Sequence, residues 1–224
     1  MKDNIDSIVN SLIQLTKDFK LKWVGDDIRK FYVKTDNYVY ALIKSETSSD
    51  TANIELRIYD NYGKKRRFIS STYEKIDELN GVVYDFVHNG KKRYDLARLT
   101  NKIVHEDYSS TKKRLYTQDE SEAFITELTE YLYENYSEDD WECDDDNCML
   151  FSCGLNGCRL VLENKSGIAT LTVWDEDGTV EIREDGYPII GMLYNKVSLL
   201  TSNEIDVYDI ICDLTDLDKK EITI

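Results

Sequence analysis

The sequence has little proline, glycine or histidine: of 224 residues, one is proline, ten are glycine and two are histidine. This scarcity excludes collagen-like and low-complexity chains, which are rich in glycine or proline. No apolar run approaches the length of about 18 residues that indicates a membrane-spanning helix. The amino terminus, Met1-Lys2-Asp3-Asn4, is largely polar and lacks the apolar core of a signal peptide, so we expect none. These absences predict a globular cytoplasmic protein that does not enter a membrane.

Motifs of common catalytic sites are also missing. There is no glycine-rich phosphate loop, which disfavours most common nucleotide enzymes. The only histidines, His88 and His105, have no recognisable nucleophile motif beside them. We therefore expect neither a cofactor nor histidine-dependent catalysis.

Charge is distributed unevenly along the chain. The 44 acidic and 28 basic residues give a formal net charge of −16, and 41% of the residues are apolar, too many for a disordered acidic tail. Residues 1–115 hold 22 Lys and Arg against 17 Asp and Glu, a net of +5, whereas residues 116–224 hold six against 27, a net of −21. Such asymmetry suggests two units with different partners.

The two halves repeat one pattern. Trp23 with the acidic pair at 26–27 matches Trp141 with the acidic pair at 144–145, and the same gap-free register carries Phe31 onto Met149 and Leu42 onto Leu160. After a shortened loop, residues 54–60 match 169–175, and Gly63 falls on Gly178. Matching tryptophans, acidic pairs and glycine turns together indicate a tandem duplication. By this comparison the two tryptophans are core anchors.

Each copy shows helical periodicity followed by strand alternation. Apolar residues recur at helical spacing over 8–19 and again over 124–136. After each of these segments, apolar and polar residues alternate as in strands, and turns rich in Asp, Asn and Gly separate the alternating runs. Closing helices are predicted at about 73–88 and 203–217. We therefore predict an α+β fold of two tandem α–β(3–4)–α units with antiparallel sheets, the repeats spanning 1–107 and 118–224 with a linker at 106–120. Residues 186–201 have no counterpart in the first copy and suit either an added strand pair or a docking surface.

Four cysteines recur every five residues, and a fifth stands apart at Cys212; the four are Cys143, Cys148, Cys153 and Cys158. Structural zinc sites usually combine two close pairs separated by a longer span, which this spacing lacks. Cys153 and Cys158 flank a turn and suit facing positions across a hairpin. Zinc, disulfides and free semi-buried thiols all remain open, and we expect free thiols and no metal.

One arrangement in the second copy suggests metal-dependent nuclease chemistry. An aspartate, Asp145 or a neighbour, precedes a strand that ends in Glu163-Asn164-Lys165, and the preceding helix offers Glu127 and Glu130. Carboxylates in this order would hold Mg²⁺ while the lysine steadies the attacking water. The order resembles, in outline, the PD-(D/E)xK nuclease core. Against it, a half with a net charge of −21 is a poor host for a polyanion.

The densest signal is an acidic run around Trp141, in which the acids are Glu138, Asp139, Asp140, Glu142, Asp144, Asp145 and Asp146. Like charges held this close repel one another, and a folded domain tolerates them more readily beside a cationic partner. We therefore predict a non-catalytic protein that captures a basic partner, as an inhibitor, an immunity or anti-defence factor or a nucleic-acid mimic does. A secretion-chaperone-like adaptor is an alternative, as is the nuclease.

Basic clusters are confined to the first copy. The run of Lys64, Lys65, Arg66 and Arg67, with tyrosines nearby, forms a secondary basic patch that suits nucleic acid, an acidic protein or the acidic copy of this same chain. Solvated hairpin charges explain it equally well.

Overall fold

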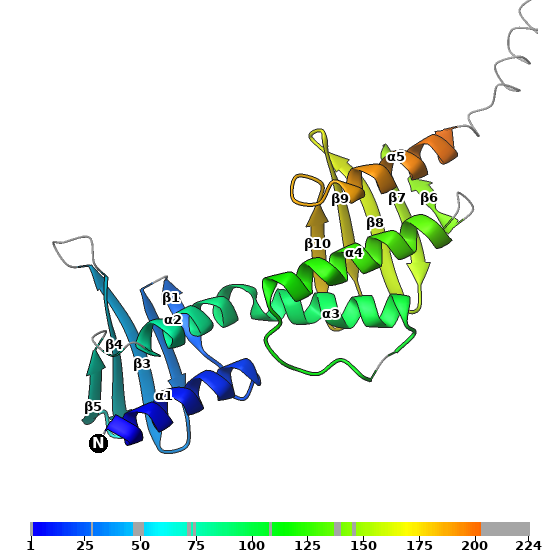
Figure 1. Ribbon diagram of the computed structural model, residues 1–224. Coiled ribbons are helices and arrows are strands. Elements are labelled where there is room, and N and C mark those ends of the chain that lie inside the picture. The colour runs from blue at the N-terminus through cyan, green and yellow to red at the C-terminus, as the bar shows by residue number, and fades with distance from the viewer. Residues whose placement is uncertain are drawn as a thin grey trace, which may run out of the picture. The chain divides into compact units, whose positions relative to one another are not determined.

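The structure is a computed structural model that describes residues 2–27, 29–46, 52–70, 73, 75–107, 109–136, 140–144 and 147–202. The chain forms two compact units (Figure 1). The first unit comprises Met1–Tyr94 and Thr111–Gln118, and the second comprises Asp95–Ser110 and Asp119–Ile224.

In the first unit, helices α1 (Lys2–Lys17) and α2 (Lys75–Asp85) pack on one face of a five-stranded antiparallel sheet of order β1-β2-β3-β4-β5. The strands are β1 (Val24–Asp27), β2 (Lys30–Lys34), β3 (Tyr38–Glu46), β4 (Ala52–Asp60) and β5 (Lys65–Ser70). The apolar residues of α1 at three- and four-residue steps, Val9, Leu12 and Ile13 among them, meet the inward side chains of β4 in one core.

The second unit repeats this arrangement with one additional helix. Its sheet has the order β10-β9-β8-β7-β6, and α4 (Gln118–Asn135), α5 (Ile189–Ser202) and α3 (Lys91–Val104) contribute to the core. The strands are β6 (Glu142–Asp144), β7 (Asn147–Leu155), β8 (Cys158–Lys165), β9 (Ile168–Trp174) and β10 (Thr179–Arg183). The predicted α+β class with two tandem antiparallel units is thereby confirmed.

Each sheet has five strands, where three or four were expected. The additional strands, β1 and β6, are short edge strands that directly follow the core tryptophans. Strand β1 has the sequence Val-Gly-Asp-Asp and β6 has Glu-Cys-Asp, so neither shows the apolar alternation by which a strand is recognised. Only pairing with β2 and β7 reveals them.

The internal repeat holds in three dimensions with one change of register. Phe31 lies opposite Leu42, and Phe151 lies opposite Leu162, so these pairs correspond. The gap-free register that matched Phe31 with Met149 was therefore wrong by two residues, because the second copy has two more residues between its tryptophan and this strand. Alternate residues of a strand share a face, so a shift of two leaves the predicted buried faces unchanged.

The closing helices settle one assignment that the sequence left open. Helix α2 lies inside the predicted range, but its counterpart α5 occupies the segment 186–201 for which a strand pair or docking surface was considered. Ile76, Leu79 and Val83 of α2 share their spacing and burial with Ile190, Leu193 and Val197 of α5. The helix predicted at 203–217 lies outside the described residues.

Helix α2 continues through a π-helical turn, η1 (Phe86–Gly90), into α3. The division into units falls after Tyr94, so most of α3 belongs to the second unit, whereas the predicted first repeat ran to residue 107. The core of the second unit takes Leu96, Leu99 and Ile103 from this helix.

Candidate functional site

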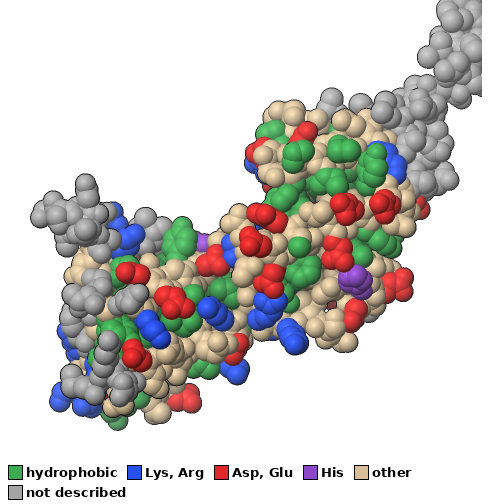
Figure 2. All heavy atoms as spheres, in the orientation of Figure 1, with side chains coloured by type: hydrophobic (Ala, Val, Ile, Leu, Met, Phe, Trp, Pro, Cys, Tyr) green, Lys and Arg blue, Asp and Glu red, His purple; other side chains and the backbone are tan. Residues whose placement is uncertain are grey.

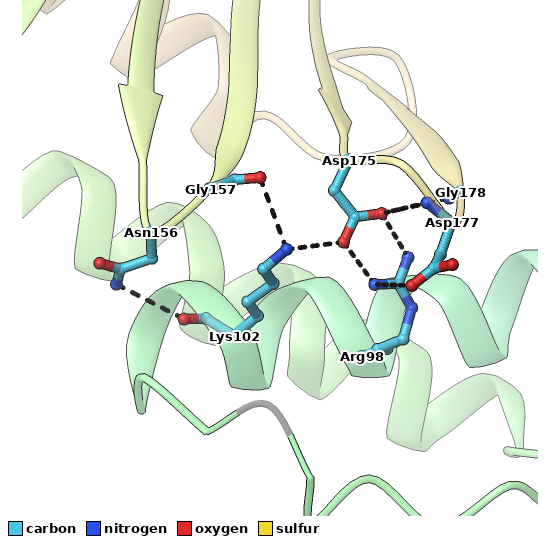
Figure 3. A network of polar contacts seen from close by, with 7 residues as sticks. All are labelled: Arg98, Lys102, Asn156, Gly157, Asp175, Asp177 and Gly178. Carbon is cyan, nitrogen blue, oxygen red and sulfur yellow. Dashed lines mark hydrogen bonds and ion pairs between the residues drawn. The ribbon is translucent and has the colours of Figure 1, made fainter.

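A polar network of the second unit joins α3 to two strand turns (Figure 3). Arg98 donates from both terminal nitrogens to the carboxylate of Asp175, at 2.5 and 2.7 Å. Lys102, one helical turn later, donates from Nζ to the same carboxylate at 2.9 Å and to the Gly157 carbonyl at 3.4 Å. The helix is thus tied to the β9–β10 turn and to the β7–β8 turn at once.

Burial makes this network strong. The side chain of Asp175 is 1% exposed, and those of Arg98 and Lys102 are 15% and 13% exposed. The hydrogen bonds from Arg98, with those from Lys102, outweigh desolvation and hold the pKa of Asp175 well below its usual range. The hydrogen bond to Asp175 likewise raises the pKa of Lys102. A carboxylate held this firmly as an anion is unsuited to proton transfer, so the network is a docking contact for α3 rather than an acid–base centre.

The turns that receive α3 are specified locally. Asn156 and Gly157 both have positive φ, 49° and 71°, as the two-residue turn between β7 and β8 requires. Asp175 accepts hydrogen bonds from the N–H groups of Asp177 and Gly178 at 3.0 and 3.1 Å, which shapes the β9–β10 turn. A Cβ added to Gly178 would lie 2.8 Å from the Asp95 carboxyl carbon, so glycine permits the close approach of α3.

The matching aspartate of the first unit, Asp60, is satisfied within its own hairpin. It accepts from the N–H groups of Tyr62 and Lys64 and pairs with Arg66 at 2.7 Å. Arg66 is the extra residue of a β-bulge between β4 and β5, a distortion that re-aims a side chain. Desolvation raises the pKa of Asp60, but the hydrogen bonds from Lys64 and Arg66 outweigh it and the net shift is downward.

The structure describes part of the predicted acidic surface. Asp140 and Glu142 are exposed on either side of the buried Trp141, and Asp144 is the last residue of the edge strand β6. Glu138, Asp139, Asp145 and Asp146 lie outside the described residues. The predicted core role of Trp141 fits its 5% exposure.

A second acidic surface lies along α4. The sequence analysis considered Glu127 and Glu130 of this helix only as metal ligands and did not predict the surface. An open groove of about 480 Å³ runs beside this helix, lined by the carboxylates of Glu127, Glu130 and Glu134 and by apolar Val104, Ala123 and Tyr131. The signal was present in the sequence, because residues 118–135 contain six acids and no Lys or Arg. We call this face, with its groove, the α4 acidic face.

In the described part of the chain, the residues considered for nuclease chemistry take part in two separate ion pairs. Glu163 and Lys165 pair with each other at 2.6 Å, and the lysine is 55% exposed. Glu127 instead lies 2.9 Å from His105. No cluster of three His, Cys, Asp or Glu side chains that could hold a metal occurs among the described residues. Asp145 is not among them.

The cysteines whose side chains are described, Cys143, Cys153 and Cys158, are free thiols, and the side chains of Cys148 and Cys212 lie outside the described residues. Cys143 is exposed, whereas Cys153 and Cys158 are buried. The latter two do not face each other across the hairpin, because Cys153 lies opposite Leu160 and Cys158 lies opposite Leu155. Burial raises the pKa of both thiols, that of Cys153 to about 12.

The secondary basic patch lies at the start of β5 and the turn before it. Lys64, Lys65 and Arg66 are exposed and Arg67 is half-buried. Arg66 is engaged by Asp60, and the exposed Lys64 and Lys65 lie beside this pair.

Within the described part of the chain, no helix has both the length and the apolar composition needed to cross a bilayer. Comparisons with protein-family models, with curated proteins and with solved structures find no match to this chain.

Proposed function

We propose that this chain is a non-catalytic cytoplasmic binding protein whose second unit captures a basic partner protein, in the manner of an inhibitor, an immunity or anti-defence factor or a nucleic-acid mimic. The observation that carries the proposal is the α4 acidic face. Glu130 and Glu134, both exposed, line a groove together with apolar side chains, and the helix that bears them has no Lys or Arg of its own. Figure 2 shows the acidic side chains along the part of the second unit where α4 lies.

The placement of the remaining charge supports this proposal. The buried carboxylate Asp175 is compensated by two cations inside the unit, so the surplus of negative charge lies at the surface. Exposed Asp140 and Glu142 extend it toward the edge strand β6. A surface with one sign of charge steers an oppositely charged partner and raises the association rate, while an apolar groove supplies contact area after encounter.

The test begins with capture of partners from host extract at low salt and continues with association kinetics against the purified partner. Two variants remove charge without truncating side chains: Glu130→Gln with Glu134→Gln on the α4 acidic face, and Asp140→Asn with Glu142→Gln beside Trp141. Both should lower the association rate constant by about tenfold or more at low salt and flatten its salt dependence. Their stability should stay within about 0.5 kcal/mol, because exposed side chains are replaced.

The matched control is Glu176→Gln with Asp185→Asn, which removes the same charge from exposed turn positions of the second unit. This control should associate nearly as fast as the original protein. The proposal fails if all three variants associate at the original rate with the original salt dependence.

A further inference from the structure

The second unit shows how this fold closes the end of its sheet at which the β7–β8 and β9–β10 turns lie. Helix α3 covers that end: Leu99 and Ile103 enter the core, and Lys102 binds both turns. The contact is electrostatically complementary, because a helix with two cations meets the buried Asp175 and the adjacent Asp177.

The corresponding end of the first unit is exposed. It consists of the β2–β3 turn and the β4–β5 turn, which contact each other through a hydrogen bond from the Asn61 side chain to the Asp36 carbonyl. Tyr62 is 96% exposed and Tyr38 is 42% exposed, so both aromatic side chains of this end face solvent. A Cβ added to Gly63 would meet no described atom within 4 Å, whereas its counterpart Gly178 is covered by Asp95.

The charge of this end is inverted relative to the second unit. Asp60 is already neutralised by Arg66 of its own bulge, and at the two turns exposed Lys34, Lys64 and Lys65 outnumber the exposed Asp36. A complementary occupant would therefore be an acidic helix with an apolar stripe, the opposite of α3.

The chain carries a segment of that chemistry. Residues 203–224 follow α5 and lie outside the described residues; they contain seven acids and two lysines. Their apolar residues recur at helical spacing at Val207, Ile210, Leu214 and Leu217, which favours an amphipathic helix. In the repeat, α5 corresponds to α2, so segment 203–224, which follows α5, has the same place in the chain as α3, which follows α2.

We propose that segment 203–224 of one copy docks on the β2–β3 and β4–β5 turns of the first unit of a second copy, as α3 docks on the second unit within one chain. Helix α3 follows α2, the closing helix of the first unit, and covers the second unit, which comes next in the chain. The first unit precedes segment 203–224 in its own chain, so the same direction of docking needs another copy. Each copy then offers one segment and one receiving end, a head-to-tail interface.

The test is the mass of the full-length protein in solution as a function of concentration, by analytical ultracentrifugation. The original protein should assemble beyond the monomer as its concentration rises. Two variants should remain monomeric: Leu214→Asp, which interrupts the apolar stripe, and Lys64→Glu with Lys65→Glu, which reverses the charge of the receiving end. An equimolar mixture of the two should form a 1:1 dimer and nothing larger, because one intact segment and one intact receiving end remain.

The matched control is Lys91→Glu with Lys92→Glu, the same charge reversal at exposed positions of the first unit. It should assemble like the original. If Leu214→Asp does not fold, as judged by circular dichroism, Asp213→Lys with Asp216→Lys replaces it. Combining these two changes with Lys64→Glu and Lys65→Glu should restore assembly.

A monomeric original protein at every concentration would overturn the proposal, as would assembly that persists in both variants. The result is separable from the proposed function, because the variants of the α4 acidic face should assemble normally whether or not they bind a partner.

Discussion

At the residue scale, the two core tryptophans are equally buried but differ in hydrogen bonding. Trp23 donates from Nε1 to the Thr16 hydroxyl at 2.8 Å, and Thr16 donates to the Leu12 carbonyl at 2.6 Å. The Nε1 of Trp141 has no hydrogen-bond partner among the described residues. Both copies therefore have a buried aromatic anchor, but among the described residues only the first copy gives its indole N–H a hydrogen-bond acceptor.

This difference predicts unequal costs for the same substitution. Trp23→Phe removes a satisfied buried donor, whereas Trp141→Phe removes an unsatisfied one, so the first should cost about 1 kcal/mol more in free energy of unfolding. Urea denaturation of the two variants measures the difference. Equal losses, or a larger loss for Trp141→Phe, would contradict the assignment of these hydrogen bonds.

The thiols provide a second prediction at this scale. The thiolate is the nucleophile, so a thiol whose pKa is about 12, as at buried Cys153, reacts slowly near neutral pH. Iodoacetamide at pH 8 should modify Cys143 in the folded protein and reach Cys153 and Cys158 only after a denaturant is added. Peptide mass spectrometry measures the extent at each site, and rapid labelling of Cys153 without denaturant would refute the prediction.

At the scale of elements, α3 illustrates how a helix is fixed by a few polar contacts beside an apolar stripe. The burial of its apolar residues is non-directional and does not fix where the helix lies. The directional contacts of Arg98 and Lys102 set its position along the turns. The close approach of Asp95 to Gly178 further restricts that position.

Removing the central carboxylate should loosen this helix. Asp175→Asn leaves Arg98 and Lys102 without their anionic partner, and breaking a buried ion pair typically costs about 3–5 kcal/mol. We expect a loss near the lower end, about 3 kcal/mol, because both cations keep some exposure to water. Urea denaturation at pH 7, with hydrogen exchange over residues 95–104, measures both the global and the local effect.

The same substitution has a pH signature. The pKa of Asp175 in the folded state lies below its unfolded value of about 3.9, so its contribution is complete above that pH and declines as pH falls toward the folded pKa. The stability difference between the original and Asp175→Asn should therefore be constant from pH 7 to about pH 5 and shrink below pH 4. Asp177→Asn is the control, because that side chain is 73% exposed and its loss should cost less than about 0.5 kcal/mol at any pH. A difference that grows on acidification would refute the ion-pair assignment.

At the scale of the whole molecule, the charge asymmetry gives the chain two kinds of electrostatic surface. The α4 acidic face of the second unit is proposed to meet a basic partner, and the lysine-bearing turns of the first unit are proposed to meet segment 203–224 of another copy. Salt weakens both associations, so salt alone does not tell them apart. The double variant Glu130→Gln with Glu134→Gln and the double variant Lys64→Glu with Lys65→Glu do tell them apart, since each changes one surface.

The sequence by itself determined what depends on local pattern. The tandem duplication, the α+β class, the buried faces of the strands and the turn at Asn156 and Gly157 all follow from periodicity and turn chemistry over a few residues. Even the register error of two residues left those faces correct, because the side-chain period of a strand is two.

Only the tertiary structure decided which segments meet. The sequence near Arg98 and Lys102 does not indicate that a helix continuous with α2 contributes to the second unit, because that pairing depends on Asp175, more than seventy residues away along the chain. The groove along α4 likewise needs Val104 of α3 as its neighbouring wall. Such contacts arise from burial and charge pairing between distant segments, which local pattern does not encode, and so the docking of α3 and the shape of the acidic face appear only in the folded chain.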